Sequence, residues 1–344
     1  MDAVLTAMVE DRIGPGEYSQ LLVQTAKERL GYDFALALRS PAIALRLALS
    51  ALGLEDGDSV LVSALSPRYY AYVLSELRLT PRYCDVSFSF PCMTRDSIEK
   101  AIETADGIKP RCIVLHHTLG FVPDTASIAA LGIPVIEDIS QSYCPEHDAN
   151  SHKGQAQKPH EGGEPDKQAS HFTILGLEEK DVLTSGGGAL LFTFNKKNSS
   201  LLRSLSNNPP EYCLPDINGA LAAAQFREAV RNMERRKEIA HAYTQASLRT
   251  RHKRFVSLDG LEYNDYAFPL IIETGVKDVV SYARKKEIII QNAFEQSLAG
   301  AGISDSKLCP VSHSLSLRTL LFPLYPRLRS TDVERVTKLL MTLP

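Results

Sequence analysis

Residues 34–52, FALALRSPAIALRLALSAL, decide the fold class of this chain. An uninterrupted apolar run is followed at once by apolar residues at three- and four-residue spacing from Pro41 to Leu52. Continuous apolar character is typical of a strand covered on both faces, whereas the second spacing is that of a helix packed on one side. Ser40 as N-cap, with Pro41 at the first helical position and Gly53 at the end, favours these helix bounds. The stretch therefore predicts a strand, a tight turn and a helix.

Six further apolar runs continue this pattern toward the C-terminus. They lie at 59–65, 82–87, 112–118, 134–140, 171–177 and 188–194, with helical patterns at 68–77, 95–104, 124–131 and 197–206. Strands that alternate with helices build a layered α/β domain. We expect a mostly parallel seven-stranded sheet sandwiched by helices.

The last third of the chain predicts a second, smaller α+β domain. A long helical pattern runs from Pro215 to about Leu248, followed by a strand at 267–273 and helices at 278–286 and 331–342. We expect a large domain over 1–225 and a small one over 226–344. The polar, Gly- and Pro-rich stretch 145–170 predicts an exposed insert. Its histidines, His147, His152 and His160, match no zinc spacing, so we expect no metal there.

Composition excludes several classes of function. The 344 residues are 44% hydrophobic and 23% charged, and the 38 basic and 41 acidic side chains form no long run of one sign. This balance argues against a nucleic-acid or membrane surface. The 6 cysteines show no CxxC pair, so we expect free thiols, and we find neither a signal peptide nor an apolar run of about 18 residues. We therefore expect a cytoplasmic protein with small-molecule or protein partners.

An acidic motif ends the predicted strand at 134–140, at the sheet edge where open α/β sheets bind ligands. It contains Glu137 and Asp138 and is followed closely by Gln141. Two acids at the end of a buried strand are costly without hydrogen-bond donors or a positive partner, so we expect a basic group to face Asp138. The alternative is a carboxylate that caps the next loop.

Two other strand ends carry candidate chemistry. Lys180 lies between the strand at 171–177 and the run Gly186-Gly187-Gly188. An amine held beside apolar strands is desolvated, which favours its nucleophilic form, and glycines allow the backbone to approach a flat ligand. The turn at Ser40 places a helix N-terminus where it could hold an anion. The alternatives are a solvated lysine, a glycine turn and an ordinary capped helix.

Taken together, the motifs resemble those of the DegT/DnrJ/EryC1/StrS aminotransferases, pyridoxal phosphate enzymes of fold type I. The similarity runs from about Tyr32 to Pro344. PVIEDISQS at 134–142 resembles the family's PVIEDAAQA, and KDVLTSGGG at 180–188 resembles K-N-x-T-T-G-E-G-G. ALRLALSALGLEDGDSVLV at 44–62 and LFPLYPRLRSTDVERV at 321–336 complete the set. Their joint occurrence is specific, whereas each alone is weak.

The resemblance implies a role for each candidate residue. Lys180 matches the lysine that forms the internal aldimine with pyridoxal 5'-phosphate, and Asp138 matches the aspartate that pairs with the pyridinium nitrogen. Gln141 matches the glutamine near the ring hydroxyl. His117 matches a histidine of the family's VHLYG stretch and would support the cofactor pocket, or else is a packed core histidine. The first helix turn, Ser40 with Ala42, matches the phosphate-binding turn.

By the same resemblance, we expect a homodimer that transfers an amino group from an amino acid, with glutamate as the expected donor, to a keto-sugar nucleotide or a similar carbonyl compound.

Departures from the family pattern support an alternative. Pro41 and Ala42 replace glycine and threonine in the phosphate-binding turn, Leu175 replaces a serine, and Pro67 replaces the aromatic residue that stacks on the cofactor. Losing about three hydrogen bonds of about 1 kcal/mol each weakens cofactor binding roughly a hundredfold. The alternative is a catalytically inactive family member that serves as a binding or structural dimer.

Overall fold

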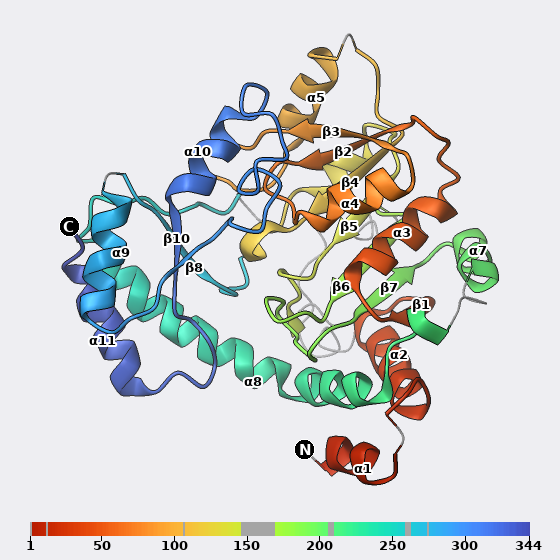
Figure 1. Cartoon of the computed structure of the whole chain (residues 1–344), viewed down its shortest axis with the longest axis horizontal. Coiled ribbons are helices and arrows are strands. Elements are labelled where there is room, and N and C mark those ends of the chain that lie inside the picture. Colours follow the sequence, from red (N-terminus) through yellow and green to blue (C-terminus); the bar gives the residue numbers. More distant parts are fainter. Residues whose placement is uncertain are drawn as a thin grey trace, which may run out of the picture.

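The computed structural model describes residues 2–11, 13–105, 107–145, 169–205, 210–258, 263–273 and 275–344. Its centre is a seven-stranded sheet in the order β1-β7-β6-β5-β4-β2-β3 (Figure 1). The strands are β1 (Phe34–Leu38), β2 (Ser59–Ser63), β3 (Thr80–Cys84), β4 (Cys112–His116), β5 (Val135–Asp138), β6 (Phe172–Gly176) and β7 (Ala189–Thr193). Six of the strands lie within predicted apolar runs, and β3 begins at Thr80, two residues before its predicted run at 82–87. The predicted seven-stranded sheet is confirmed.

The sheet is mostly parallel, as expected. Strands β3, β2, β4, β5 and β6 pair in parallel, whereas β7 pairs antiparallel with both β6 and β1. Parallel strands need crossover connections, and those between β2 and β3, β3 and β4, and β4 and β5 contain α4 (Tyr69–Glu76), α5 (Arg95–Glu103) and α6 (Thr125–Ala129), in that order. The carboxyl ends of β4, β5 and β6 therefore meet at one edge of the sheet.

Helices cover both faces of this sheet and make a three-layer sandwich. Val60 and Val62 of β2 pack in a cluster with α3 and α4, whereas Leu61 packs on the opposite face with Ile98 of α5. Successive side chains of a strand point to opposite faces, which explains this division. The helices are α3 (Pro41–Ala51), α4 (Tyr69–Glu76), α5 (Arg95–Glu103), α6 (Thr125–Ala129), α7 (Lys196–Leu205) and the 3-10 turns η1 (Thr118–Gly120) and η4 (Pro210–Tyr212).

Two N-terminal helices that the sequence analysis did not predict pack beside a long helix. They are α1 (Asp2–Val9) and α2 (Glu17–Leu30), and the long helix is α8 (Asp216–Ser247). The buried Asp216 carboxylate accepts hydrogen bonds from the backbone N–H groups of Gly16 (2.8 Å) and Ser19 (2.9 Å). The first residue of α8 therefore provides an acceptor for N–H groups at the N-terminus of α2 that have no backbone acceptor within their helix.

A small antiparallel sheet lies at the far end of α8 (Figure 1). Its order is β8-β10-β9, with β8 (Phe268–Ile271), β9 (Gln291–Asn292) and β10 (Thr319–Phe322), and the helices beside it are α9 (Val276–Lys285), α10 (Pro310–Arg318) and α11 (Ser330–Met341). The expected domain boundary at 225/226 falls inside α8, which runs unbroken from one sheet to the other. The two-domain division stays a prediction.

The remaining sequence predictions concern the insert, the cysteines and membrane spans. Of the expected insert 145–170, residues 146–168 and their histidines lie outside the described residues. All 6 cysteines are free thiols, and only Cys213 among them is not buried. Among the described helices, none combines the length and the apolar character that a membrane span needs.

Candidate functional site

A cavity of about 430 Å³ lies at the carboxyl ends of β4, β5 and β6. Asp138 ends β5, Gln141 follows it in the next loop, and Lys180 lies in the loop after β6; all three line this cavity. Residues that are up to 42 positions apart in the sequence thus meet because parallel strands end at one edge. The structure brings together the three residues that the sequence analysis placed around one ligand.

The Asp138 carboxylate is buried and accepts four hydrogen bonds. Its Oδ1 accepts from the Ser140 backbone N–H (3.1 Å) and from the Ser140 hydroxyl (2.5 Å). Its Oδ2 accepts from the hydroxyls of Tyr70 (2.7 Å) and Tyr69 (3.2 Å). The partners are therefore neutral donors, and the basic group that the sequence analysis expected opposite Asp138 is not among them. Four donors satisfy a buried carboxylate without a cation.

His116, rather than His117, lies on the cavity. His116 is the last residue of β4 and is in register with Asp138 of β5, so both side chains point to the same face of the sheet. Burial lowers the pKa of His116 to about 4, which keeps the imidazole neutral. Its Nδ1 lies 3.0 Å from the Thr118 hydroxyl. The sequence analysis missed this residue, although the alternation of side chains along a strand could have shown it.

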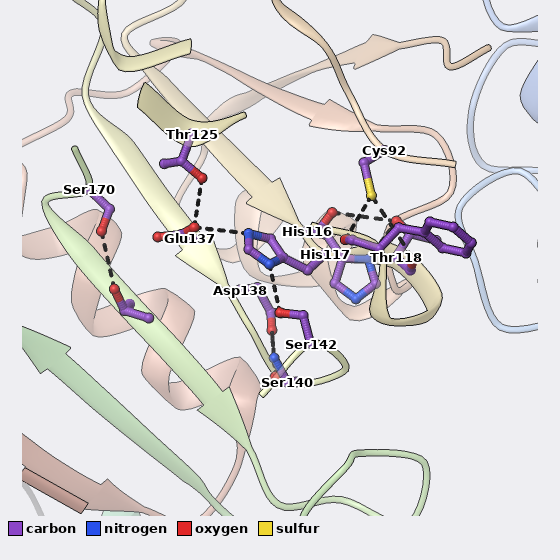
Figure 2. A network of polar contacts seen from close by, with 12 residues as sticks. Cys92, His116, His117, Thr118, Thr125, Glu137, Asp138, Ser140, Ser142 and Ser170 are labelled. Atoms are coloured by element: carbon purple, nitrogen blue, oxygen red, sulfur yellow. Dashed lines mark hydrogen bonds and ion pairs between the residues drawn. The ribbon is translucent and has the colours of Figure 1, made fainter. Parts of the chain in front are cut away.

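His117 points away from the cavity and joins a second polar network (Figure 2). Its Nδ1 lies 2.6 Å from the Ser142 hydroxyl, and its Nε2 lies 2.9 Å from Glu137 Oε1. Burial alone would raise the pKa of Glu137, but His117 and the Thr125 hydroxyl lower it below its usual range. Of the two adjacent acids, it is thus Glu137 that meets an imidazole. This position favours the structural alternative for His117 over contact with a cofactor.

Lys180 is exposed, and residues just before β8 hold its loop and the neighbouring loop of Gln141. The Tyr266 hydroxyl donates a hydrogen bond to the Lys180 carbonyl, while the Asn264 amide donates to the Gln141 carbonyl (2.8 Å). The expected desolvation of Lys180 between apolar strands is therefore wrong, because the loop carries it beyond the end of β6. Lys180 instead lines this cavity and also a larger, neighbouring cavity.

The glycine run after Lys180 serves chain packing. Gly187 and Gly188 have φ of 123° and 124°, a backbone that side chains rarely allow. A Cβ on Gly188 would lie 2.4 Å from Leu214 Cδ1, so glycine permits the close return of the chain into β7. In the described part of the chain, none of the three glycines lines the cavity, and their close approach to a flat ligand stays a prediction.

Asp181 is a second acid near Asp138, half-buried at the cavity, and the sequence analysis did not single it out. Its Oδ2 accepts a hydrogen bond from the Glu178 N–H (2.8 Å), and a Cβ on Gly176 would lie 2.3 Å from that oxygen. Glycine at 176 therefore makes room for this carboxyl group. Burial, reinforced by the charge of Asp138, raises the pKa of Asp181 well above its usual range. Because Asp181 directly follows Lys180 in the sequence, its position could have identified it as a candidate site residue.

The helix turn before α3 offers few groups to an anion. The Ser40 hydroxyl already accepts a hydrogen bond from the Ile43 N–H (3.3 Å), Pro41 has no N–H, and Ala42 has no hydroxyl. Of this turn, Pro41 is the residue that lines the cavity. Leu175, where the family has a serine, is buried without a polar group. The residues present thus fit the aldehyde, the ring hydroxyl and the ring nitrogen of pyridoxal phosphate, but they provide few donors for its phosphate.

A larger cavity of about 1240 Å³ adjoins the first one. The two share the segment Glu179–Asp181, so Lys180 lines both. The larger cavity lies between α8 and the small sheet and is lined by Arg236, Arg327 and Arg335 along with Tyr266 and Tyr325. Lys180 therefore lies where the two cavities meet.

Comparisons with known proteins agree with this geometry. A sequence model described as the DegT/DnrJ/EryC1/StrS aminotransferase family matches residues 1–208 and 195–341. An aminotransferase of that description from Brucella abortus superposes with a TM-score of 0.80 at 19% identity, covering 98% of this chain and 93% of that one. A putative sugar aminotransferase from Streptococcus pneumoniae, in its PMP form, gives 0.81 at 16%, covering 99% and 93%. The aminotransferase DesV of S. venezuelae, in complex with a ketimine intermediate, gives 0.81 at 19%, covering 99% and 92%.

Proposed function

Because the chain belongs to the DegT/DnrJ/EryC1/StrS aminotransferase family, a family of pyridoxal phosphate-dependent enzymes, we propose that it is an aminotransferase in which Lys180 binds the cofactor covalently. One observation carries the proposal: Lys180, Asp138 and Gln141 come from separate segments and line the same cavity of about 430 Å³. Fold similarity at these identities would not suffice, because function depends on the site.

Each residue has a role that its surroundings support. When bound, the cofactor supplies an aldehyde and an electron-withdrawing ring. The Lys180 Nζ would hold the aldehyde carbon of the cofactor, and its amine would carry a proton to and from the substrate carbon. The Asp138 carboxylate offers its negative charge to the ring nitrogen. The Gln141 Oε1 accepts from the Leu119 N–H (2.7 Å), which leaves its amide NH₂ to donate toward the ring hydroxyl.

For the substrates, we propose an amino acid donor, glutamate first, and a keto-sugar nucleotide or a similar carbonyl acceptor. The structurally similar proteins from Streptococcus pneumoniae and Micromonospora echinospora are described as sugar aminotransferases. The larger cavity beside Lys180 has room for such an acceptor, and its arginines supply positive charge for phosphate groups. We also propose that the protein functions as a homodimer.

A second candidate function is an inactive family member that binds a partner. It is favoured by the Asp138 carboxylate, whose four acceptor positions are filled by protein donors, and by the few phosphate donors near α3. Against it, a protein without cofactor has no evident need to hold Lys180, Asp138 and Gln141 around one cavity.

The decisive test is chemical labelling of the lysine. Purified protein is mixed with pyridoxal phosphate, its visible spectrum is recorded, and the sample is reduced with borohydride and mapped by peptide mass spectrometry. We expect an adduct on Lys180 that Lys180→Ala abolishes without loss of fold. Exposed Lys277, changed to alanine, is the matched control and leaves the adduct intact.

Glutamate is then added to the unreduced complex, and we expect its spectrum to change to that of the pyridoxamine form. An adduct without this change would favour the cofactor-binding but inactive alternative. Labelling of other lysines with none on Lys180 would contradict the proposal.

A further inference from the structure

The four donors on Asp138 are not equally fixed. Ser140 donates through its backbone and through a hydroxyl that also accepts from the Gly176 N–H (2.7 Å), so both of its bonds belong to the sheet edge. The Tyr70 side chain is fully buried, and its ring meets that of His116 edge-on at 6.3 Å. The Tyr69 bond is the longest of the four at 3.2 Å, and Tyr69 itself lines the cavity, whereas Tyr70 does not.

Tyr69 is the first residue of α4 and is placed for this contact by the helix. Its ring meets that of Tyr70 edge-on, with centroids 5.0 Å apart, so the two hydroxyls converge on the same carboxylate oxygen. Burial and the charge of Asp138 raise the pKa of Tyr69 well above its usual value, so the hydroxyl stays protonated and donates. A carboxylate has about four acceptor positions, and here all are in use.

We propose that the Tyr69 hydroxyl occupies the acceptor position on Asp138 Oδ2 that the ring nitrogen of the cofactor needs, and that it must be displaced when the cofactor binds. This inference rests on the proposed function. Tyr69 would then set the affinity for the cofactor. Without cofactor, its hydroxyl donates to the buried Asp138 carboxylate. Cofactor binding breaks this hydrogen bond, and the free energy of the broken bond is subtracted from the binding free energy.

Replacement of the hydroxyl by hydrogen tests the idea. In Tyr69→Phe the Asp138 carboxylate loses one donor, which the ring N–H of the cofactor would then replace. We expect pyridoxal phosphate, titrated by absorbance and by tyrosine fluorescence, to bind about tenfold more tightly, the factor that corresponds to one charge-assisted hydrogen bond. Tyr72→Phe is the matched control, because Tyr72 lies on the same helix with 69% exposure, and we expect no change.

Two simple aldehydes separate the ring nitrogen from every other contact. 3-Hydroxypyridine-4-carboxaldehyde and salicylaldehyde differ only by a ring nitrogen in place of a CH. We expect Tyr69→Phe to tighten binding of the first about tenfold and to change that of the second less than twofold. Equal gains for both would mean that the variant only enlarges the cavity, which would overturn the inference.

The outcomes distinguish this inference from the proposed function. An adduct on Lys180 with equal pyridoxal phosphate affinity in wild type and Tyr69→Phe overturns the role of Tyr69 alone. Weaker binding in Tyr69→Phe also overturns it, since the hydroxyl would then support the cofactor. No adduct on Lys180 in either protein contradicts the proposed function and this inference with it.

Discussion

His116 is a neutral imidazole in the wall of a cavity that also contains acids. Burial lowers its pKa to about 4 although Asp138 lies on the same face, so desolvation outweighs the attraction of the carboxylate. The hydroxyl of Thr118 and the ring of Tyr70 are its other neighbours. At neutral pH this residue therefore adds no positive charge to the cavity, and Lys180 and Arg68 are the basic side chains that line it.

The low pKa of His116 predicts a pH dependence of stability. Between pH 6.5 and 4 the unfolded chain binds a proton at this residue and the folded protein does not, so stability falls as the pH drops through this window and levels off below about 4. From pH 7 to pH 5 the loss assigned to His116 is about 1–2 kcal/mol. Urea unfolding of wild type and His116→Gln at both pH values measures it.

The variant should show a smaller loss than wild type over this pH range. His241→Gln, at an exposed position of α8, serves as control and should keep the wild-type dependence. Identical pH dependence in wild type and His116→Gln would show that burial does not suppress protonation of His116.

The polar groups at the N-terminus of α3 are used mainly within the helix itself, and few of them remain for a ligand. Ser40 caps the Ile43 N–H, and proline at the first helical position removes one free donor. Four acids, Asp138, Glu178, Glu179 and Asp181, also line the cavity. Both features disfavour a doubly charged phosphate.

We therefore expect the phosphate of the cofactor to contribute little to its affinity. Pyridoxal and pyridoxal phosphate should bind with dissociation constants within about tenfold, a difference of about 1.4 kcal/mol. Ala42→Thr adds a hydroxyl to the turn and should tighten pyridoxal phosphate severalfold while leaving pyridoxal unchanged. Equilibrium titration of wild type and Ala42→Thr with each ligand measures these dissociation constants. A hundredfold preference of wild type for pyridoxal phosphate would contradict the small contribution expected of the phosphate.

The buried strands and most helices could be predicted from sequence because their signals are local. Runs such as Phe172–Gly176 are apolar throughout, and the Ser40-Pro41 pair marks a helix start. The missed helix α2 has a weaker pattern and is fixed by a contact with Asp216, about 200 residues away in the sequence. The two-residue strand β9 exists only through its pairing with β10. Contacts of this range leave no local signal.

The same limit applies to the site. Lys180, Asp138 and Gln141 were predictable because they carry recognisable motifs at strand ends, and the structure brings them to one cavity. The Tyr69 and Tyr70 hydroxyls reach Asp138 from a helix almost 70 residues earlier. No sequence motif links these two tyrosines to Asp138, so sequence alone could not show that their hydroxyls donate to this carboxylate.

At the N-terminal end of the molecule, α1, α2 and the part of α8 that packs against them expose apolar side chains. Helix α8 packs against both N-terminal helices (Figure 1), and residues of α8 between Leu221 and Arg236 also line the larger cavity. The exposed apolar residues on these helices are Leu5, Met8, Val9, Leu21, Leu221 and Val230. Exposed apolar surface favours an interface with another protein surface, and a stable dimer buries more than about 1,000 Å².

We expect this end of the molecule to form the homodimer contact. Sedimentation should give wild type twice the chain mass of 37.9 kDa, and the double variant Val9→Glu/Leu21→Glu should sediment as a monomer, because two charges per subunit would be buried in the contact. The control is Leu317→Glu on α10, which is 74% exposed outside this group of helices and should stay dimeric. A wild-type monomer would contradict the dimer itself, whereas a dimeric double variant would move the contact to another face.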